Sequence, residues 1–98
     1  MRVVWSRTAL QRVDEIALYI AQEDRRAAIR WTASLFDAVE RLADFPESGR
    51  AVSGLGAREV RELVSGAYRV FYRVGKQVEV LTVRHARQNP PADEVEEA

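Results

Sequence analysis

The sequence VRELVSGAYRVFYRV, residues 60–74, decides the fold of this chain. Apolar and polar side chains follow one another with a period of two in its second half, which is typical of a β-strand. The Ser65–Gly66 pair before it is typical of a tight hairpin turn. The stretch therefore predicts two antiparallel strands, residues 58–64 and 67–74.

Further strands are predicted on both sides of this hairpin. QVEVLTVRH, residues 77–85, follows the turn residues Gly75 and Lys76 and is apolar on both faces in its middle, as a central strand is. Near the start of the chain, residues 2–5 predict a short strand. Together these segments predict a four-stranded, mainly antiparallel sheet.

Two amphipathic helices are predicted between the first strand and the hairpin. Apolar residues recur with the helical period from Ala9 to Ile20 and again from Ala28 to Leu42. Ser6 and Asp24 suit the N-cap positions, and Pro46 ends the second helix. Residues 47–57 are predicted to be a loop. Four aromatic residues of the first half are expected in the core or at an interface: Trp5, Tyr19, Trp31 and Phe36.

The element order β-α-α-β-β-β predicts an α+β two-layer sandwich. A helical hairpin packs on one face of the sheet, and residues 1–89 form a single domain. No run is long enough to span a membrane, and the chain has no cysteine. Its single histidine has no metal-ligand partner at suitable spacing. We therefore expect a cytoplasmic protein with no metal and no cofactor.

Charge is distributed unevenly along the chain. Residues 51–89 carry seven basic and three acidic side chains, whereas residues 90–98, PPADEVEEA, carry four acidic side chains and no basic one. Two prolines and this charge predict a flexible acidic tail that does not pack. The alternatives are a tail that masks the basic sheet or one that docks on a partner.

One face of the predicted sheet is left open by the helices. Alternation places Tyr68, Val70, Tyr72 and Val74 towards the helices. Val60 and Val64 suit the same inner face. Arginine forks and an exposed aromatic ring on the open face would bind anions such as nucleic-acid phosphates. The other interpretation is a charged face that only keeps the protein in solution. The predicted binding set consists of Arg61, Arg69, Phe71, Arg73, Arg84, His85 and Arg87.

His85 is the only histidine. As a general acid or base it would need neighbours that set its pKa and a substrate within reach. A single histidine at the end of a strand is more often a structural hydrogen-bonding residue. Both interpretations stay open.

Four stretches together resemble one known family. They are the N-terminal SRTALQRVDEIALYIAQED, the helix AAIRWTASLFDAVERLADFPESGR, the hairpin VRELVSGAYRVFYRV and the last strand VEVLTVRHARQ. The chain resembles the RelE/ParE superfamily, the toxins of type II toxin–antitoxin modules, over about residues 2–89. The helix length and the stretch YIAQED resemble the ParE branch more than the RelE branch.

This resemblance implies a partner and a target. The partner is a small antitoxin whose C-terminal segment wraps the toxin in a hetero-oligomer. ParE-branch toxins poison DNA gyrase, whereas RelE-branch toxins cut mRNA on the ribosome. Arg69 matches the arginine of the shared strand motif, and Arg87, or Ala86 in another register, matches a second basic position.

Two departures from the RelE pattern bear on the activity. Residues 58–64 contain no lysine, and no tyrosine follows the last strand. The groups left to move a proton are His85, Tyr68 and Glu62, because arginine stays charged. We therefore expect a gyrase-binding toxin that is not an enzyme. The alternatives are a ribosome-dependent mRNA endonuclease that uses Arg69, His85 and Arg87, and a non-toxic homologue that binds only antitoxin or nucleic acid.

Overall fold

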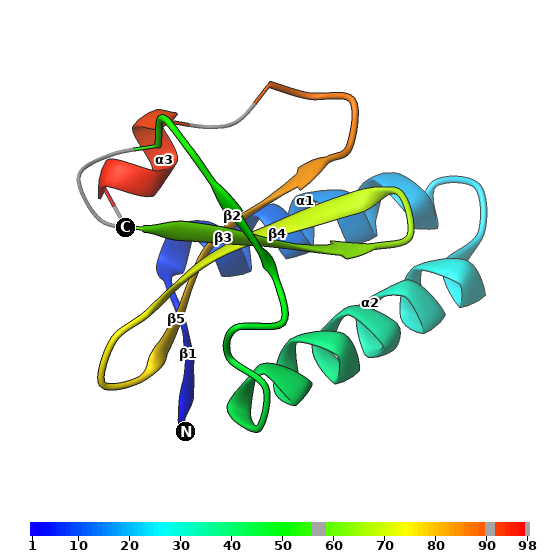
Figure 1. The fold of residues 1–98 in the computed structure, drawn as a ribbon. Helices are drawn as coiled ribbons and strands as arrows, with labels where there is room; N and C mark the ends of the chain where they lie inside the picture. The colour runs from blue at the N-terminus through cyan, green and yellow to red at the C-terminus, as the bar shows by residue number, and fades with distance from the viewer. Residues whose placement is uncertain (56–58, 90–91, 98) are drawn as a thin grey trace.

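The computed structural model describes residues 1–55, 59–89 and 92–97. One sheet runs through this part of the chain, with the strand order β1-β5-β4-β3-β2 (Figure 1). Neighbouring strands are antiparallel except β1 and β5, which are parallel. The elements are β1 (Val3–Trp5), α1 (Arg7–Ala21), α2 (Arg25–Glu40), a 3₁₀ turn (Arg41–Ala43), β2 (Arg50–Val52), β3 (Val60–Ser65), β4 (Tyr68–Val74), β5 (Val78–His85) and α3 (Ala92–Glu97).

The predicted hairpin is confirmed as β3 and β4. Ser65 is opposite Tyr68 at the closed end, and Leu63 is opposite Val70 further along the ladder. Gly66 turns the chain with φ at 59°, a left-handed conformation that favours glycine. The short connection fixes the register of the strands, and the register fixes which side chains share a face.

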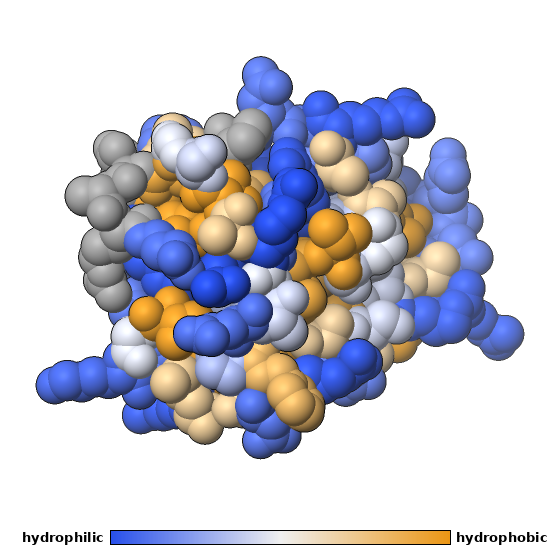
Figure 2. Space-filling view, in the orientation of Figure 1, coloured by the Kyte–Doolittle hydropathy of each residue, from blue (hydrophilic) through white to orange (hydrophobic). Residues whose placement is uncertain are grey.

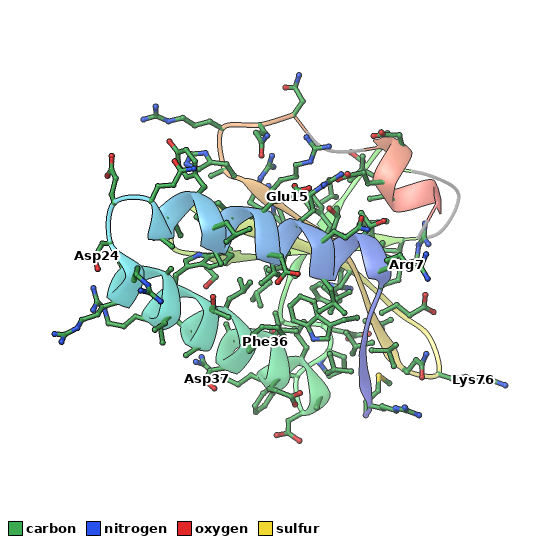
Figure 3. The ribbon with its side chains drawn as sticks, turned by 180° about the vertical axis from the view of Figure 1, so that it is seen from behind. Arg7, Glu15, Asp24, Phe36, Asp37 and Lys76 are labelled. Atoms are coloured by element: carbon green, nitrogen blue, oxygen red, sulfur yellow. The ribbon has the colours of Figure 1, made fainter. Side chains whose placement is uncertain are left out.

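Both helices begin at the predicted caps. Ser6 accepts a hydrogen bond from the amide of Ala9 at 3.0 Å, and Asp24 accepts one from Ala27 at 3.1 Å. The Ser6 hydroxyl also donates to the carbonyl of Leu81 at 2.8 Å, which joins the start of α1 to β5. Figure 3 views the molecule from the side of these helices and shows Asp24 in the turn between them. Within the described residues, no helix is long and apolar enough to cross a membrane.

The main core lies between the helices and the sheet face that they cover, which we call the inner face. Its fully buried members include Leu35 and Val39 of α2 and Val70 and Tyr72 of β4. Trp5, Trp31 and Phe36 pack against this core, and the rings of Trp5 and Phe36 lie 4.6 Å apart. These three aromatic residues were predicted correctly. Tyr19 is not a core residue, because it is 71% exposed on α1.

We call the sheet face opposite the inner face the outer face. A bulge in β5 places an apolar residue on it. Phe71 is opposite Thr82, but Tyr72 is opposite Val80, so Leu81 is an extra residue in the ladder. Val80 joins the main core, whereas Leu81 joins a second apolar cluster. The prediction that β5 is a central strand, apolar on both faces, is therefore confirmed. The outer cluster consists of Leu55, Val60, Phe71, Leu81 and Val95.

The predicted α+β architecture is confirmed, with one strand more than expected. β2 lies within the predicted loop 47–57 and pairs with β3, with Ala51 opposite Arg61. Three residues flanked by glycine and serine are too few to show an alternating pattern. Sequence patterning therefore could not separate β2 from a loop.

The predicted orientation of β3 is wrong. Residues directly opposite one another in an antiparallel pair share a face. Leu63 is opposite Val70 of the main core, so Leu63 and Arg61 lie on the inner side. Val60 instead joins the outer cluster, and Val64 is 62% exposed. The VRELV stretch carries apolar residues on both faces, so its alternation did not decide between them.

The prediction that residues 90–98 do not pack is wrong for α3. Glu94 and Val95 are buried, and α3 contacts β5. Val95 belongs to the outer cluster, and Glu94 accepts hydrogen bonds from Arg12 of α1 and Arg84 of β5. The two buried residues are adjacent within an acidic segment, so composition alone did not reveal them.

Candidate functional site

Four predicted binding residues lie on the outer face of the sheet: Arg69, Phe71, Arg73 and Arg84. Arg69 is opposite Arg84 across the β4–β5 ladder, and Phe71 belongs to the outer cluster. The alternation predicted for β4 is therefore correct. Figure 2 views the side opposite α1 and α2, where hydrophilic residues are mixed with hydrophobic ones.

Arg69 is held by groups of the protein itself. It pairs with Glu62 at 3.2 Å and donates a hydrogen bond to the carbonyl of Gln88. Its guanidinium carbon lies 5.2 Å from the centre of the Phe71 ring. Glu62 is buried and also pairs with Arg50, so one carboxylate bridges two arginines. Arg50 was not a predicted site residue, because it lies in the unrecognised strand β2.

Arg84 shares a carboxylate with a residue of α1. Glu94 of α3 accepts hydrogen bonds from Arg84 at 3.2 and 3.3 Å and from Arg12. The hydroxyl of Thr82 donates to the same carboxylate at 2.9 Å. Burial works to raise the pKa of Glu94, but the hydrogen bonds of Arg12 and Thr82 and the charges of both arginines outweigh it. The pKa of Glu94 is therefore lower than its ordinary value, and the carboxylate stays charged at neutral pH.

Arg73 is the most enclosed of the predicted arginines, with 9% of its surface exposed. Its Nε is buried, and among the described residues it forms no hydrogen bond. Glu79 is its neighbour across the ladder, on the same face. Most of the Arg73 side chain is therefore enclosed by the protein.

The prediction that Phe71 is exposed is wrong. Its ring is fully buried in the outer cluster, covered by Leu55 before β3 and by Val95 of α3. Phe71 cannot stack on a nucleic-acid base in this arrangement. The sheet face that was predicted to be open is therefore covered by Leu55 and by Val95 of α3, and the sequence pattern did not predict this packing.

Arg61 does not belong to the outer face, contrary to the prediction. Its side chain donates to the carbonyl of Gly49 at 2.8 Å and to that of Glu47 at 3.2 Å. It also pairs with Glu59 at 2.9 Å. These contacts attach the segment after α2 to β3, which is a structural role.

His85 and Arg87 lie at the rim of the sheet, as predicted. The Nδ1 atom of His85 accepts a hydrogen bond from the Arg87 amide at 3.1 Å, and the His85 amide donates to the side chain of Gln88 at 2.9 Å. The ring of His85 lies edge-on to Tyr68, and Tyr68 lies edge-on to Trp31. His85 thus has a structural role in the turn after β5, and its ring packs against that of Tyr68.

Tyr68 and Glu62 are the remaining proton-transfer candidates. Burial raises the pKa of Tyr68, with a smaller contribution from Tyr19, so its hydroxyl keeps its proton at neutral pH. Glu62 is bound by Arg50 and Arg69. In the described part of the chain, no three histidine or acidic side chains are grouped so that they could hold a metal ion.

A second surface lies on the helical hairpin, and the sequence did not single it out as a site. An apolar groove of about 390 Å³ is lined by Ala17 of α1 and by Ala28, Ile29, Thr32 and Ala33 of α2. Leu18, Tyr19 and Ile29 are each at least 70% exposed. Ile29 is both exposed and part of the groove, and an exposed apolar surface of this kind marks an interaction site. Leu18 and Ile29 were not predicted to belong to any site, and Tyr19 was expected in the core or at an interface.

Comparison with known families gives one match over most of the chain. The family described as "ParE toxin of type II toxin-antitoxin system, parDE" matches residues 3–90. The matched range includes α1, α2 and all five strands, and therefore both surfaces described above.

Individual relatives agree with this match. A putative toxin Y4kP from Sinorhizobium fredii is 42% identical over 92% of this chain and 93% of its own length. Toxin ParE1 of Caulobacter vibrioides is 34% identical (89% and 91% covered), and toxin RelE2 of the same bacterium is 36% identical (87% and 94% covered). A solved structure, the chromosomal ParDE system from P. aeruginosa, has the same fold with a TM-score of 0.72 at 23% identity, over 87% of this chain and 95% of that one.

Proposed function

Because this chain belongs to the ParE family of toxins from type II toxin–antitoxin systems, we propose that it stops bacterial growth by binding DNA gyrase. It acts in the cytoplasm and needs no cofactor. Its effect comes from binding, without a reaction catalysed by its own side chains. A cognate antitoxin neutralises it.

The observation that carries this proposal is the state of the proton-transfer groups. RNA cleavage needs one group to take a proton from the 2′-hydroxyl and another to protonate the leaving oxygen. The Nδ1 atom of His85 is engaged by the Arg87 amide, and Glu62 is bound between two arginines. Arginine cannot serve, because it keeps its charge. A binding mechanism requires none of these groups to be free.

An mRNA endonuclease remains the second candidate function, for a specific reason. Arg69 and His85 both contact Gln88, so the two residues lie near one another at the rim, next to Arg87. A relative that is 36% identical carries the name toxin RelE2. If this site cuts RNA, His85→Ala must abolish toxicity while the fold is kept.

Two assays in parallel test the proposal. Purified gyrase is given the protein in a supercoiling assay, and a translation reaction with the same protein is mapped by primer extension. We expect inhibited supercoiling and intact message. Cuts at defined codon positions with unaffected supercoiling would replace the gyrase proposal with the endonuclease. Expression without any growth defect would support a non-toxic homologue.

The hairpin surface supports a protein partner. A partner helix with apolar residues on one side would cover Ile29 and fill the groove between α1 and α2. We propose that the antitoxin uses this surface and forms a hetero-oligomer with the toxin. One chain of the solved ParDE system has the same fold as this chain, which supports a complex of this kind.

A further inference from the structure

Glu94 occupies an anion-binding site that the folded body supplies. Its carboxylate accepts hydrogen bonds from the Nε of Arg12 at 2.8 Å, from Thr82 at 2.9 Å and from Arg84 at 3.2 Å. The donors come from α1 and β5, whereas the acceptor comes from α3. Only 7% of the Glu94 side chain is exposed, so the contact is not a surface ion pair of negligible strength.

Val95 occupies an apolar site next to this carboxylate. It is fully buried against Leu55, Val60, Phe71 and Leu81. By contrast, Ala92 and Asp93 of the same helix are exposed. The body therefore recognises two adjacent features of α3, a carboxylate and an aliphatic side chain.

The strand and the helix that carry the binding groups are held in place independently of α3. Thr82 and Arg84 belong to β5, which is paired with β4 along this part of the sheet. Arg12 is also held by Glu15 of its own helix, at 2.8 and 3.0 Å. Figure 3 shows Glu15 on the edge of α1 that faces β5 and α3. A preorganised site of this kind loses little entropy when a ligand binds.

The site offers more room than α3 uses. A cavity of about 280 Å³ has Arg12 and Arg84, which both hold Glu94, in its walls, together with Glu15, Ile16, Val83 and Gln88. α3 is a six-residue helix, and the tether that joins it to β5 is short. A short tether gives an effective concentration in the millimolar range, so even a weak ligand stays bound in cis.

We propose that Arg12, Thr82, Arg84 and the outer apolar cluster form a binding site for an acidic–aliphatic peptide segment, which α3 occupies in cis and a partner segment of the same chemistry occupies in trans. The apolar floor favours a peptide over a nucleic acid. A phosphate chain would satisfy the arginines but leave Leu55, Val60, Phe71 and Leu81 uncovered. This site does not depend on whether gyrase or the ribosome is the target.

The test uses the full chain and a labelled synthetic peptide, PPADEVEEA, the sequence of residues 90–98. Glu94→Gln weakens the occupant in cis, so the peptide should bind this variant at least tenfold more tightly than the wild type, as measured by fluorescence anisotropy. Asp93→Asn is the matched control, because it changes the same charge at an exposed position of α3 and should leave the affinity unchanged. A peptide with glutamine at the position of Glu94 should lose at least tenfold in affinity.

Three results would overturn the proposal. One is equal peptide affinity for the wild type, Glu94→Gln and Asp93→Asn. Another is equal affinity for the peptides with glutamate and with glutamine at the position of Glu94. The third is that Glu94→Gln binds a labelled single-stranded oligonucleotide more tightly than the wild type does, but not the peptide. The arginines would then form a phosphate-binding site. A measurement without any variant supports the same test: excess peptide should accelerate hydrogen exchange of the hydrogen-bonded amides of α3 in the wild-type chain, and unchanged exchange would contradict displacement.

Discussion

Tyr72 joins the sheet to the segment that follows α2. Its ring is fully buried in the main core, its hydroxyl donates to the carbonyl of Pro46 at 2.8 Å, and the amide of Gly49 donates to it at 2.8 Å. Burial raises the pKa of Tyr72, partly offset by the Gly49 hydrogen bond, so the hydroxyl keeps its proton at neutral pH. Alternation predicted that Tyr72 faces inward. It did not predict the partners of the hydroxyl, which come from a segment without a repeating pattern.

Tyr72→Phe should lower the free energy of unfolding by about 1–3 kcal/mol, because a backbone amide and a carbonyl would lose their buried partner. Urea unfolding monitored by circular dichroism measures the change. Tyr19→Phe is the control, since this tyrosine is 71% exposed and its hydroxyl should matter little. Equal stability of both variants would show that the Tyr72 hydroxyl is replaceable by water.

Gly49→Ala should also destabilise the protein. A Cβ atom at this position would lie 2.7 Å from the backbone oxygen of Glu62, and the Tyr72 ring is equally close. Since backbone cannot move aside cheaply, the expected loss is about 1–3 kcal/mol. The melting temperature compared with that of Ser53→Ala, an exposed position nearby, checks the prediction. A Gly49→Ala variant as stable as this control would contradict the close approach.

At the scale of elements, the long regular segments were predictable and the short ones were not. α1, α2, β4 and β5 show several turns or alternations, and two N-caps mark the helix starts. β2 has three residues and α3 has six, so neither shows a full pattern. The candidate site shows the same difference. Alternation predicted which arginines lie on the outer face, but not that Glu62 and Glu94 form ion pairs with two of them. Ion pairing depends on which segments the fold brings together.

The packing of α3 should depend on pH. The folded-state pKa of Glu94 is below its ordinary value of 4.5, so α3 packing contributes stability above about pH 4.5 that is lost as the pH falls through the folded-state pKa. Arg12 and Arg84 stay charged throughout, and Glu15 is the other titratable partner of Arg12. An NMR titration of the Val95 methyl groups should show release of α3 in acid. In Glu94→Gln this step should be absent; an identical acid transition in both proteins would assign it to another group.

The helical hairpin should carry antitoxin affinity. Ile29→Asp places a charge beside the groove, where 70% of the isoleucine is exposed, and should weaken binding of the cognate antitoxin about tenfold or more. Isothermal titration calorimetry gives the affinity. Lys76→Ala is the control, because Figure 3 shows Lys76 in the β4–β5 turn, away from both helices. Comparable losses of antitoxin affinity in Ile29→Asp and Lys76→Ala would show that the antitoxin binds another surface.

At the scale of the whole molecule, the described residues form two apolar clusters that share a single sheet. Leu35 of α2 lies in the main core, and Leu81 of β5 lies in the outer cluster. Tyr72 and Phe71 are neighbours in β4 but belong to different clusters. Because the same strands supply both clusters, the loss of one should weaken the sheet that supports the other.

Leu35→Ala and Leu81→Ala should each cost about 2–5 kcal/mol, and unfolding should stay a single transition. Trp5 and Trp31 report on the main core by fluorescence, whereas circular dichroism reports on all elements. Coincident urea curves from both probes are expected in the Leu81→Ala variant. Two separate midpoints would show that the outer cluster unfolds independently.

The parallel pairing of β1 with β5 has a consequence for each newly made copy of the protein. Val3 pairs with Val78, so the ribosome must add 75 residues after Val3 to complete its partner. At about 5–20 residues per second, the ribosome needs roughly 4–15 s to add them. During that time β1 has no strand to pair with and the main core lacks Val78, Val80 and Val83. A bacterium that makes this toxin therefore has an interval of seconds, in every round of translation, before the molecule can take its final shape.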